Sequence, residues 1–137
     1  MREEIVVAID PGREKCGIAV VHRARGVMDK TIIATAELVK VVTSLVTTYK
    51  VTTAVIGDRT TSHTAQTALA GIKLNGENIA IIPVNEHRST DEARKRYWNE
   101  HPPTGLKRLI PTTMQVPPGP VDDYVAVILA ERYFAGQ

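Results

Sequence analysis

The first part of the chain is built from runs of consecutive apolar residues separated by short polar links. Residues 5–10 begin with five apolar residues, mostly β-branched, and Pro11-Gly12 then interrupts the run. This pattern is typical of a strand that is buried on both faces and ends in a tight turn. Apolar, mostly β-branched residues resume over 16–22 and again over 27–34, after short links. The three runs therefore predict an antiparallel meander.

The spacing of the apolar residues changes after residue 35. Between residues 36 and 49, apolar side chains recur every three or four positions, which predicts an amphipathic helix. The later elements follow from the same two patterns: a buried strand over 53–57, a helix over 63–74 that Asn75-Gly76 ends, a strand over 79–84, a short helix over 89–98, an irregular loop over 101–120 and a final helix from about 120 to 134. This order predicts an α/β fold, with a mixed sheet and helices on both of its faces.

Two local signals define the second half of the chain. Ser89 and Glu92 have the spacing of a capping box, so the short helix is expected to begin there. The segment 101–120 contains six prolines and two glycines, which is typical of an irregular loop. In the final helix the expected apolar stripe consists of Val121, Val125, Ile128 and Leu129.

Length and composition predict one ordinary globular domain, spanning residues 1–137. Aromatic residues make up only 4% of the sequence, so the core must be aliphatic. The single cysteine, Cys16, excludes an internal disulfide, fits a reducing compartment and is expected to be a small buried side chain. No signal peptide, transmembrane run or lipidation motif is found, which predicts a cytoplasmic protein without a membrane partner.

Four carboxylates stand where predicted elements end or begin. Asp10, Asp58 and Glu86 each follow a strand, and Asp122 lies in the first turn of the final helix. Singly, each has an ordinary structural explanation, as the cap of a turn or as an acid at a helix N-terminus. Together they can converge, because parallel strands place their carboxyl ends at one edge of a sheet, and carboxylate oxygens are the ligands that Mg²⁺ or Mn²⁺ needs. Two such ions activate a water and stabilise the leaving oxygen in phosphodiester hydrolysis.

Four sequence blocks resemble, in order and over nearly the whole chain, the YqgF/RuvX family of the ribonuclease H-like superfamily. Members of that family are described as Holliday junction resolvases or as nucleases that mature ribosomal RNA precursors. The first of these blocks alone is weak evidence for the resemblance, since actin-like ATPases use a similar Asp-x-Gly turn. The four blocks in this order are considerably more specific. The blocks are Val6-Val7-Ala8-Ile9-Asp10-x-Gly12 with Gly17-x-Ala19-Val20, then Val55-Ile56-Gly57, then Glu86-x-x-Ser89-Thr90-x-Glu92-Ala93, then Val121-Asp122-x-x-x-Ala126.

The resemblance implies a ribonuclease H-like fold with a mixed five-stranded sheet in the order 3-2-1-4-5. It also implies that Asp10, Glu86 and Asp122 are the catalytic carboxylates and bind Mg²⁺ or Mn²⁺. Asp58 is a candidate for a supplementary metal ligand, because related ribonuclease H-like enzymes carry a ligand at the end of this strand.

Basic residues gather between the middle acid and residue 108, where they suit binding of a phosphate backbone. Trp98 lies among them, and it can stack on an unpaired base or fill the core; the sequence leaves both open. Arg59 and Thr60, just after the fourth strand, are further candidates for phosphate contacts. The expected nucleic-acid contacts are Arg59, Thr60, Arg88, Arg94, Lys95, Arg96, Trp98, Lys107 and Arg108.

Together these features predict a nuclease that uses two metal ions to hydrolyse phosphodiester bonds in single-stranded or structured nucleic acid, such as a ribosomal RNA precursor or a DNA junction. The alternative is a nucleic-acid-binding relative with weak catalysis, because Asn85 and His87 stand beside the middle acid where the family has Asp and Arg. An actin-like ATPase is disfavoured, since that fold needs a second domain. The expected partner is RNA or DNA, and the protein is expected to be a monomer or a homodimer.

Overall fold

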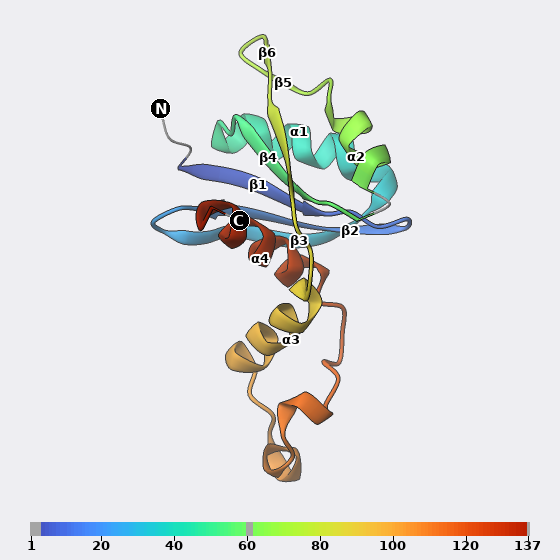
Figure 1. Cartoon of the computed structure of the whole chain (residues 1–137), viewed down its shortest axis with the longest axis vertical. Helices are drawn as coiled ribbons and strands as arrows, with labels where there is room; N and C mark the ends of the chain where they lie inside the picture. Colours follow the sequence, from blue (N-terminus) through green and yellow to red (C-terminus); the bar gives the residue numbers. More distant parts are fainter. Residues whose placement is uncertain (1–3, 60–61, 137) are drawn as a thin grey trace.

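Five strands form one mixed sheet with the first strand at its centre (Figure 1). The computed structural model describes residues 4–59 and 62–136. β1 (Ile5–Asp10) pairs antiparallel with β2 (Lys15–His22), which pairs antiparallel with β3 (Gly26–Ala34). On its other side β1 pairs parallel with β4 (Thr53–Gly57), and β4 pairs parallel with β7 (Ala80–Val84). The order β3-β2-β1-β4-β7 confirms the predicted sheet order and the α/β class.

Helices cover both faces of this sheet (Figure 1). One face carries α1 (Leu38–Tyr49), which follows the short 3-10 turn η1 (Thr35–Glu37), together with α2 (Ser62–Leu69). The other face carries α4 (Asp122–Phe134), and α3 (Ser89–Glu100) packs against α4. Within the described ranges, none of these helices has the length and apolar character needed to cross a membrane.

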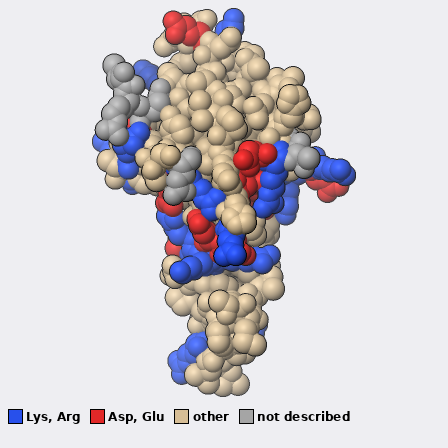
Figure 2. All heavy atoms as spheres, viewed as in Figure 1, with Lys and Arg blue, Asp and Glu red and all other residues tan. Residues whose placement is uncertain are grey.

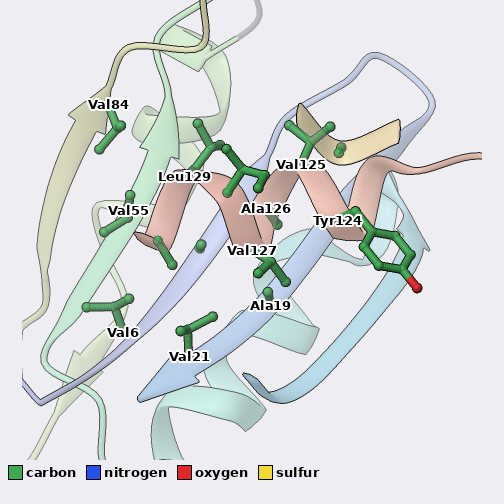
Figure 3. Close-up of a cluster of buried hydrophobic side chains, with 14 of the residues drawn as sticks. Val6, Ala19, Val21, Val55, Val84, Tyr124, Val125, Ala126, Val127 and Leu129 are labelled. Atoms are coloured by element: carbon green, nitrogen blue, oxygen red, sulfur yellow. The ribbon is translucent and has the colours of Figure 1, made fainter. Parts of the chain in front are cut away.

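The alternation of side chains along β1 divides the core between the two faces. Val7 and Ile9 pack with α1 and α2, whereas Val6 and Ala8 pack with α4, and all four side chains are fully buried. Figure 3 shows the second of these clusters, which combines sheet residues such as Val6 and Val55 with α4 residues such as Leu129. Because both faces are covered, the strand is a continuous apolar run rather than an alternating one, as the sequence analysis predicted.

α4 is buried on more of its surface than the sequence analysis predicted. Every residue from Tyr124 to Ala130 is buried. The sheet covers one side of the helix and α3 covers another, so the expected stripe is only part of the buried surface. The helix that carries Asp122 is therefore firmly packed within the fold.

The predicted helix over 63–74 is wrong in its second half. α2 ends at Leu69, and a two-stranded hairpin follows, formed by β5 (Lys73–Leu74) and β6 (Glu77–Asn78). Asn75 and Gly76, at its tip, have φ values of 54° and 84°. Consecutive left-handed residues of this kind form the tight turn of a hairpin, and Asn-Gly is the sequence most favoured there. The dipeptide therefore joins two strands instead of ending a helix.

The predicted capping box is also wrong, although α3 does begin at Ser89. The residue at the N-cap is Arg88, with a left-handed φ of 58°, and no side chain caps the helix. The backbone N–H of Ser89 donates to Glu86 O at 2.9 Å, so a turn after β7 starts the helix. The Glu92 carboxylate accepts a hydrogen bond from Arg132 Nη2 at 2.9 Å, which connects α3 to α4.

α3 and the segment after it project from the sheet and its helices (Figure 1). The segment 101–120 is irregular, as predicted, apart from two short 3-10 turns, η2 (Gly105–Leu109) and η3 (Thr112–Met114). We call residues 89–120 the arm, and residues 101–120 its tip. The arm begins three residues after Glu86 and ends two residues before Asp122.

Candidate active site

Asp10 lies at the centre of one edge of the sheet, as the last residue of β1. In the register of the sheet it is opposite Gly17 of β2. On the other side Ile9 pairs with Ile56 of β4, so Gly57 is the neighbour in the next row. A residue without a side chain therefore stands on each side of Asp10, and each glycine makes room for one of the other predicted acids.

Gly17 makes room for Asp122. A Cβ atom at position 17 would lie 1.9 Å from the backbone oxygen of Asp122, the first residue of α4. The start of α4 thus lies directly against β2 beside Asp10, and only glycine permits that approach. The Asp122 side chain is partly exposed, with Lys15 Nζ 3.5 Å from its Oδ2.

Gly57 makes room for Glu86. A Cβ atom at position 57 would lie 1.6 Å from Glu86 Oε1, because the Glu86 side chain lies across the end of β4. This path brings the Glu86 carboxyl group to Asp10, although their strands are separated by β4. Only 2% of the Glu86 side chain is exposed.

Burial and the neighbouring acids disfavour the ionised form of Asp10. Burial, followed by the charges of Glu86 and Asp122, raises the pKa of Asp10 from 3.8 to about 7, while Arg59 opposes the shift. Burial also raises the pKa of Glu86, against the lowering effect of Arg59 and with a further increase from Asp58. Neighbouring carboxylates repel one another unless a proton or a cation lies between them. The site therefore favours uptake of positive charge.

Arg59 supplies part of that charge. Its Nε lies 2.6 Å from Glu86 Oε2, and its side chain is 61% exposed. The contact is an ion pair without aligned hydrogen-bond geometry: among the described residues, neither carboxylate oxygen of Glu86 has a hydrogen-bond partner, although both are buried. Buried carboxylate oxygens without donors are costly. A ligand at this site would relieve that cost.

Asp58 contacts the backbone of the Glu86 segment. Its Oδ1 accepts a hydrogen bond from the backbone N–H of Glu86 at 3.2 Å, and its own N–H donates to Val84 O at 3.1 Å. The side chain is exposed. In this arrangement Asp58 holds the end of β7 in place, and its role as a metal ligand remains a prediction.

The predicted acids have the oxygen donors that a divalent cation prefers, and the side chains of Asp10 and Glu86 already lie next to each other. Asp10 and Glu86 offer hard oxygen ligands, and among the described residues Glu86 Oε1 has neither a hydrogen-bond partner nor the ion pair that Oε2 makes with Arg59. In the described ranges, however, no three residues of the His, Cys, Asp and Glu types lie close enough together to form a metal site. Asp122 is the acid that would have to approach to complete one.

The predicted nucleic-acid contacts fall into distinct groups. Arg96 donates to both oxygens of Glu131 at 2.8 Å, so its guanidinium joins α3 to α4. Trp98 is half-buried against the tip of the arm, and Arg59 lies beside Glu86. Thr60 lies outside the described residues. The remaining contacts are exposed on or beside the arm: Arg88, Arg94, Lys95, Lys107 and Arg108.

Sequence reasoning missed the roles of Gly17 and Gly57 and the contact of Lys15. The two glycines were noted only as parts of sequence blocks. Their signal was available: each stands in an apolar β-branched run, where glycine weakens a strand and often marks a close approach of another group. What approaches could not be known before the sheet register was known.

A cavity of about 610 Å³ lies on the side of α1 and α2, next to the β1–β2 turn. Its lining includes Gly12, Cys16 and Thr35, and the predicted acids do not contribute to it. Cys16 is fully buried, as predicted. The acids thus lie at the sheet edge outside this cavity, which suits a large substrate better than an enclosed small molecule.

Solved structures of RuvC resemble this chain in fold. The structure of RuvC from Thermus thermophilus covers 96% of this chain and 94% of its own, with a TM-score of 0.57 and 13% identity. RuvC from T. thermophilus in complex with Holliday junction substrate covers the same shares, with a TM-score of 0.56 and 14% identity. No protein-family model matches the sequence, and no curated protein does. The likeness shows the fold and confirms the predicted ribonuclease H-like architecture.

Proposed function

We propose that this protein is a metal-dependent nuclease that hydrolyses phosphodiester bonds in RNA or DNA at the edge of its sheet. The observation that carries the proposal is the convergence of Asp10 and Glu86, with Asp122 close enough to raise the pKa of Asp10. The fold is shared with RuvC, one structure of which holds a Holliday junction substrate. The resemblance of the sequence to the YqgF/RuvX family points to the same class of reaction.

Each acid has a role in this proposal. Asp10 and Glu86 would hold Mg²⁺ or Mn²⁺ together, and Asp122 would complete the ligand set from the start of α4. The bound ion would supply Lewis-acid stabilisation of the phosphate and a water of lowered pKa. Arg59 would leave Glu86 when the ion arrives, and its exposed guanidinium would then bind a substrate phosphate.

The test is cleavage of labelled single-stranded RNA, single-stranded DNA and a four-way junction, each with Mn²⁺, Mg²⁺ or EDTA. Wild type is compared with Asp10→Asn and Asp122→Asn. We expect metal-dependent cleavage that each variant reduces at least ~100-fold, because metal-ion catalysis contributes several kcal/mol and 1.36 kcal/mol is tenfold in rate. Asp29→Asn is the matched control, since Asp29 is an exposed acid of β3.

A second candidate is a nucleic-acid-binding protein of the same fold with little catalysis. It is favoured by the lack of a three-residue metal group among the described residues and by Asn85 and His87 beside Glu86. Binding of the same three substrates without cleavage, in wild type as well as in Asp10→Asn, would support this candidate. Cleavage unaffected by Asp10→Asn would contradict the nuclease site itself.

A further inference from the structure

The tip of the arm exposes large apolar side chains. Leu106 is 85% exposed, Leu109 77%, Met114 76% and Val116 77%. In the rest of the described chain, the exposed large apolar side chains reach at most 43%. Such a concentration of exposed apolar side chains in one short segment marks an interaction surface.

The tip has a defined backbone structure. Gln115 Nε2 donates to Lys107 O and to Ile110 O, both at 2.9 Å, and so ties the two 3-10 turns together. The backbone N–H of Ile110 also donates to Lys107 O, at 3.0 Å. The apolar side chains are therefore presented outward from a hydrogen-bonded scaffold, and their exposure is not the result of an unstructured segment.

The charged side chains of the tip itself all have one sign. No Asp or Glu occurs between residues 101 and 121, whereas Lys107 and Arg108 lie among the exposed leucines. Figure 2 shows the same asymmetry: the lower part of the molecule carries blue and tan atoms on this face but no red ones. An acid beside the tip is on α3, where Asp91 shares a pocket with Arg94, Lys95 and residues of the tip. An apolar surface whose own charges are all positive complements a ligand that offers both apolar rings and negative charge.

The arm is joined to the candidate active site at both ends. It begins just after Glu86 and ends just before Asp122. Near the sheet α3 is held against α4 by the Arg96–Glu131 pair at 2.8 Å and by Tyr124 Oη, which donates to Glu100 Oε1 at 3.2 Å. A ligand bound by the arm would therefore be held at a fixed position relative to the acids.

We infer that the tip binds unpaired bases of nucleic acid, with Leu106, Leu109 and Met114 contacting the base rings and Lys107 and Arg108 contacting phosphates. Apolar side chains inserted beside or between bases are a known way of holding unstacked nucleotides, and cations on either side neutralise the backbone. This inference rests on the proposed function and narrows its substrate class. The protein should prefer single strands and junctions, which offer unpaired or unstacked bases, to continuous duplex.

The test measures binding in EDTA, so that it does not depend on cleavage. Fluorescence anisotropy is recorded with a single strand, a four-way junction and a continuous duplex, each labelled. We expect the double variant Leu106→Ser/Leu109→Ser to bind the single strand and the junction about tenfold more weakly, because two leucine side chains no longer bury apolar surface against the bases, with little change for duplex. Lys107→Gln/Arg108→Gln should weaken binding to all three and reduce the salt dependence. Met28→Ser, at an exposed apolar residue of β3, is the control.

Three outcomes would overturn the inference. The first is equal loss of affinity for duplex and single strand in the leucine variant, and the second is no loss for either. The third is a wild type that elutes as a dimer in light-scattering chromatography and becomes a monomer in the leucine variant with unchanged affinity for the probes, which would make the tip a self-association surface. Metal-dependent cleavage by wild type alongside any of these results would leave the proposed function intact and refute only the role of the tip.

Discussion

The pKa of Asp10 is raised towards neutral pH by burial and by two acids from distant parts of the chain. Its pKa of about 7 is set first by burial and then by Glu86 and Asp122. An ionised acid in this position lowers the stability of the fold but favours cation binding. Active sites commonly combine these two effects. The consequence is measurable without any substrate.

The first prediction concerns stability against pH in the absence of metal. Because the pKa of Asp10 is raised from 3.8 to about 7 on folding, the folded protein binds this proton more tightly than the unfolded chain does. The stability that the proton supplies is complete below the unfolded value and is lost as pH rises from about 4 to about 7. Asp10→Asn should not lose this contribution. Above pH 7 it should therefore be more stable than wild type by on the order of 1–3 kcal/mol.

Urea unfolding in EDTA at several pH values between 4 and 8 measures this difference. Other groups titrate in both proteins, so the difference between the two curves isolates Asp10. If the free energy of unfolding changed with pH in the same way for both proteins, folding would not raise the pKa of Asp10.

The second prediction concerns Gly57. In Gly57→Ala the new Cβ would meet the Glu86 carboxyl group, which is the end of a flexible side chain and can move away. The variant should therefore fold, but Glu86 should no longer lie beside Asp10. The affinity for Mn²⁺ and any cleavage rate should fall at least ~10-fold. Losses of this size in affinity or activity are seen when the groups that orient metal ligands are disturbed. Gly71→Ala is the control, since a Cβ there meets nothing within 4 Å.

Thermal unfolding with and without Mn²⁺ checks this prediction. If Mn²⁺ raised the unfolding temperature of Gly57→Ala as much as that of wild type, the position of the Glu86 side chain across the end of β4 would not be required for metal binding.

At the residue scale, the sequence predicted which acids lie at the ends of elements. It did not predict which neighbouring positions must lack a side chain. Asp10 and Asp122 could be placed because each ends or begins a strongly patterned element. The need for glycine at 17 and 57 depends on which strand lies beside which, and on where α4 starts. Those are tertiary facts that no local pattern contains.

At the scale of elements, the pair α3 and α4 holds the middle acid in place. Arg132 of α4 is nearly buried; its Nη1 donates to Asn85 O at 2.7 Å and its Nη2 to Glu92 Oε1 at 2.9 Å. One guanidinium thus holds the segment that carries Glu86 and the first turn of α3. Hydrogen bonds from a charged donor are among the stronger ones.

The third prediction follows from this contact. Arg132→Met keeps the apolar stem but removes both hydrogen bonds, and it should lower the free energy of unfolding by about 1–3 kcal/mol. It should also weaken the stabilisation by Mn²⁺, because the segment with Glu86 is then less well held. Arg94→Met, on an exposed position of α3, should change the free energy of unfolding by less than ~0.5 kcal/mol. Chemical denaturation of the three proteins provides the comparison, and equal stability of the two variants would contradict it.

The elements themselves could be predicted from the sequence wherever a long apolar pattern exists. The three strands of the meander and α4 are of this kind. The errors occurred at short signals with two meanings: Asn75-Gly76 ends helices and also turns hairpins, and Ser89 with Glu92 has capping-box spacing without forming one. In the first case the strands on either side of the turn pair with each other, and in the second the Arg132 guanidinium of another helix binds Glu92.

At the scale of the whole molecule, the sheet with its helices and the tip of the arm differ in how they are held. The sheet lies between two buried clusters, whereas four large apolar residues of the tip are more than three-quarters exposed. The sheet order followed from the family resemblance and the strand pattern. The projection of the arm did not, because a proline-rich segment can equally well lie flat on a surface.

The fourth prediction uses this difference. Trypsin should cut first after Lys107 or Arg108, because η2 is exposed and none of its residues is buried. The nicked protein should stay folded, since α4 remains buried against the sheet. Mass spectrometry of the early fragments and circular dichroism of the nicked protein test both parts. First cleavage elsewhere, or unfolding on nicking, would show that the tip is better protected or more necessary than the structure indicates.

The position of the arm affects how the sequence of such a protein can evolve. The chain leaves the sheet edge after Glu86 and returns at Asp122, so residues of the tip can be inserted, deleted or exchanged without altering a strand of the sheet. With the roles proposed above for the tip and the acids, changes in target preference and changes in chemistry would fall on different stretches of sequence and could be selected separately. A grafted tip from another protein would be expected to redirect the same acids to a different target, which makes residues 101–120 the natural place to re-engineer this fold.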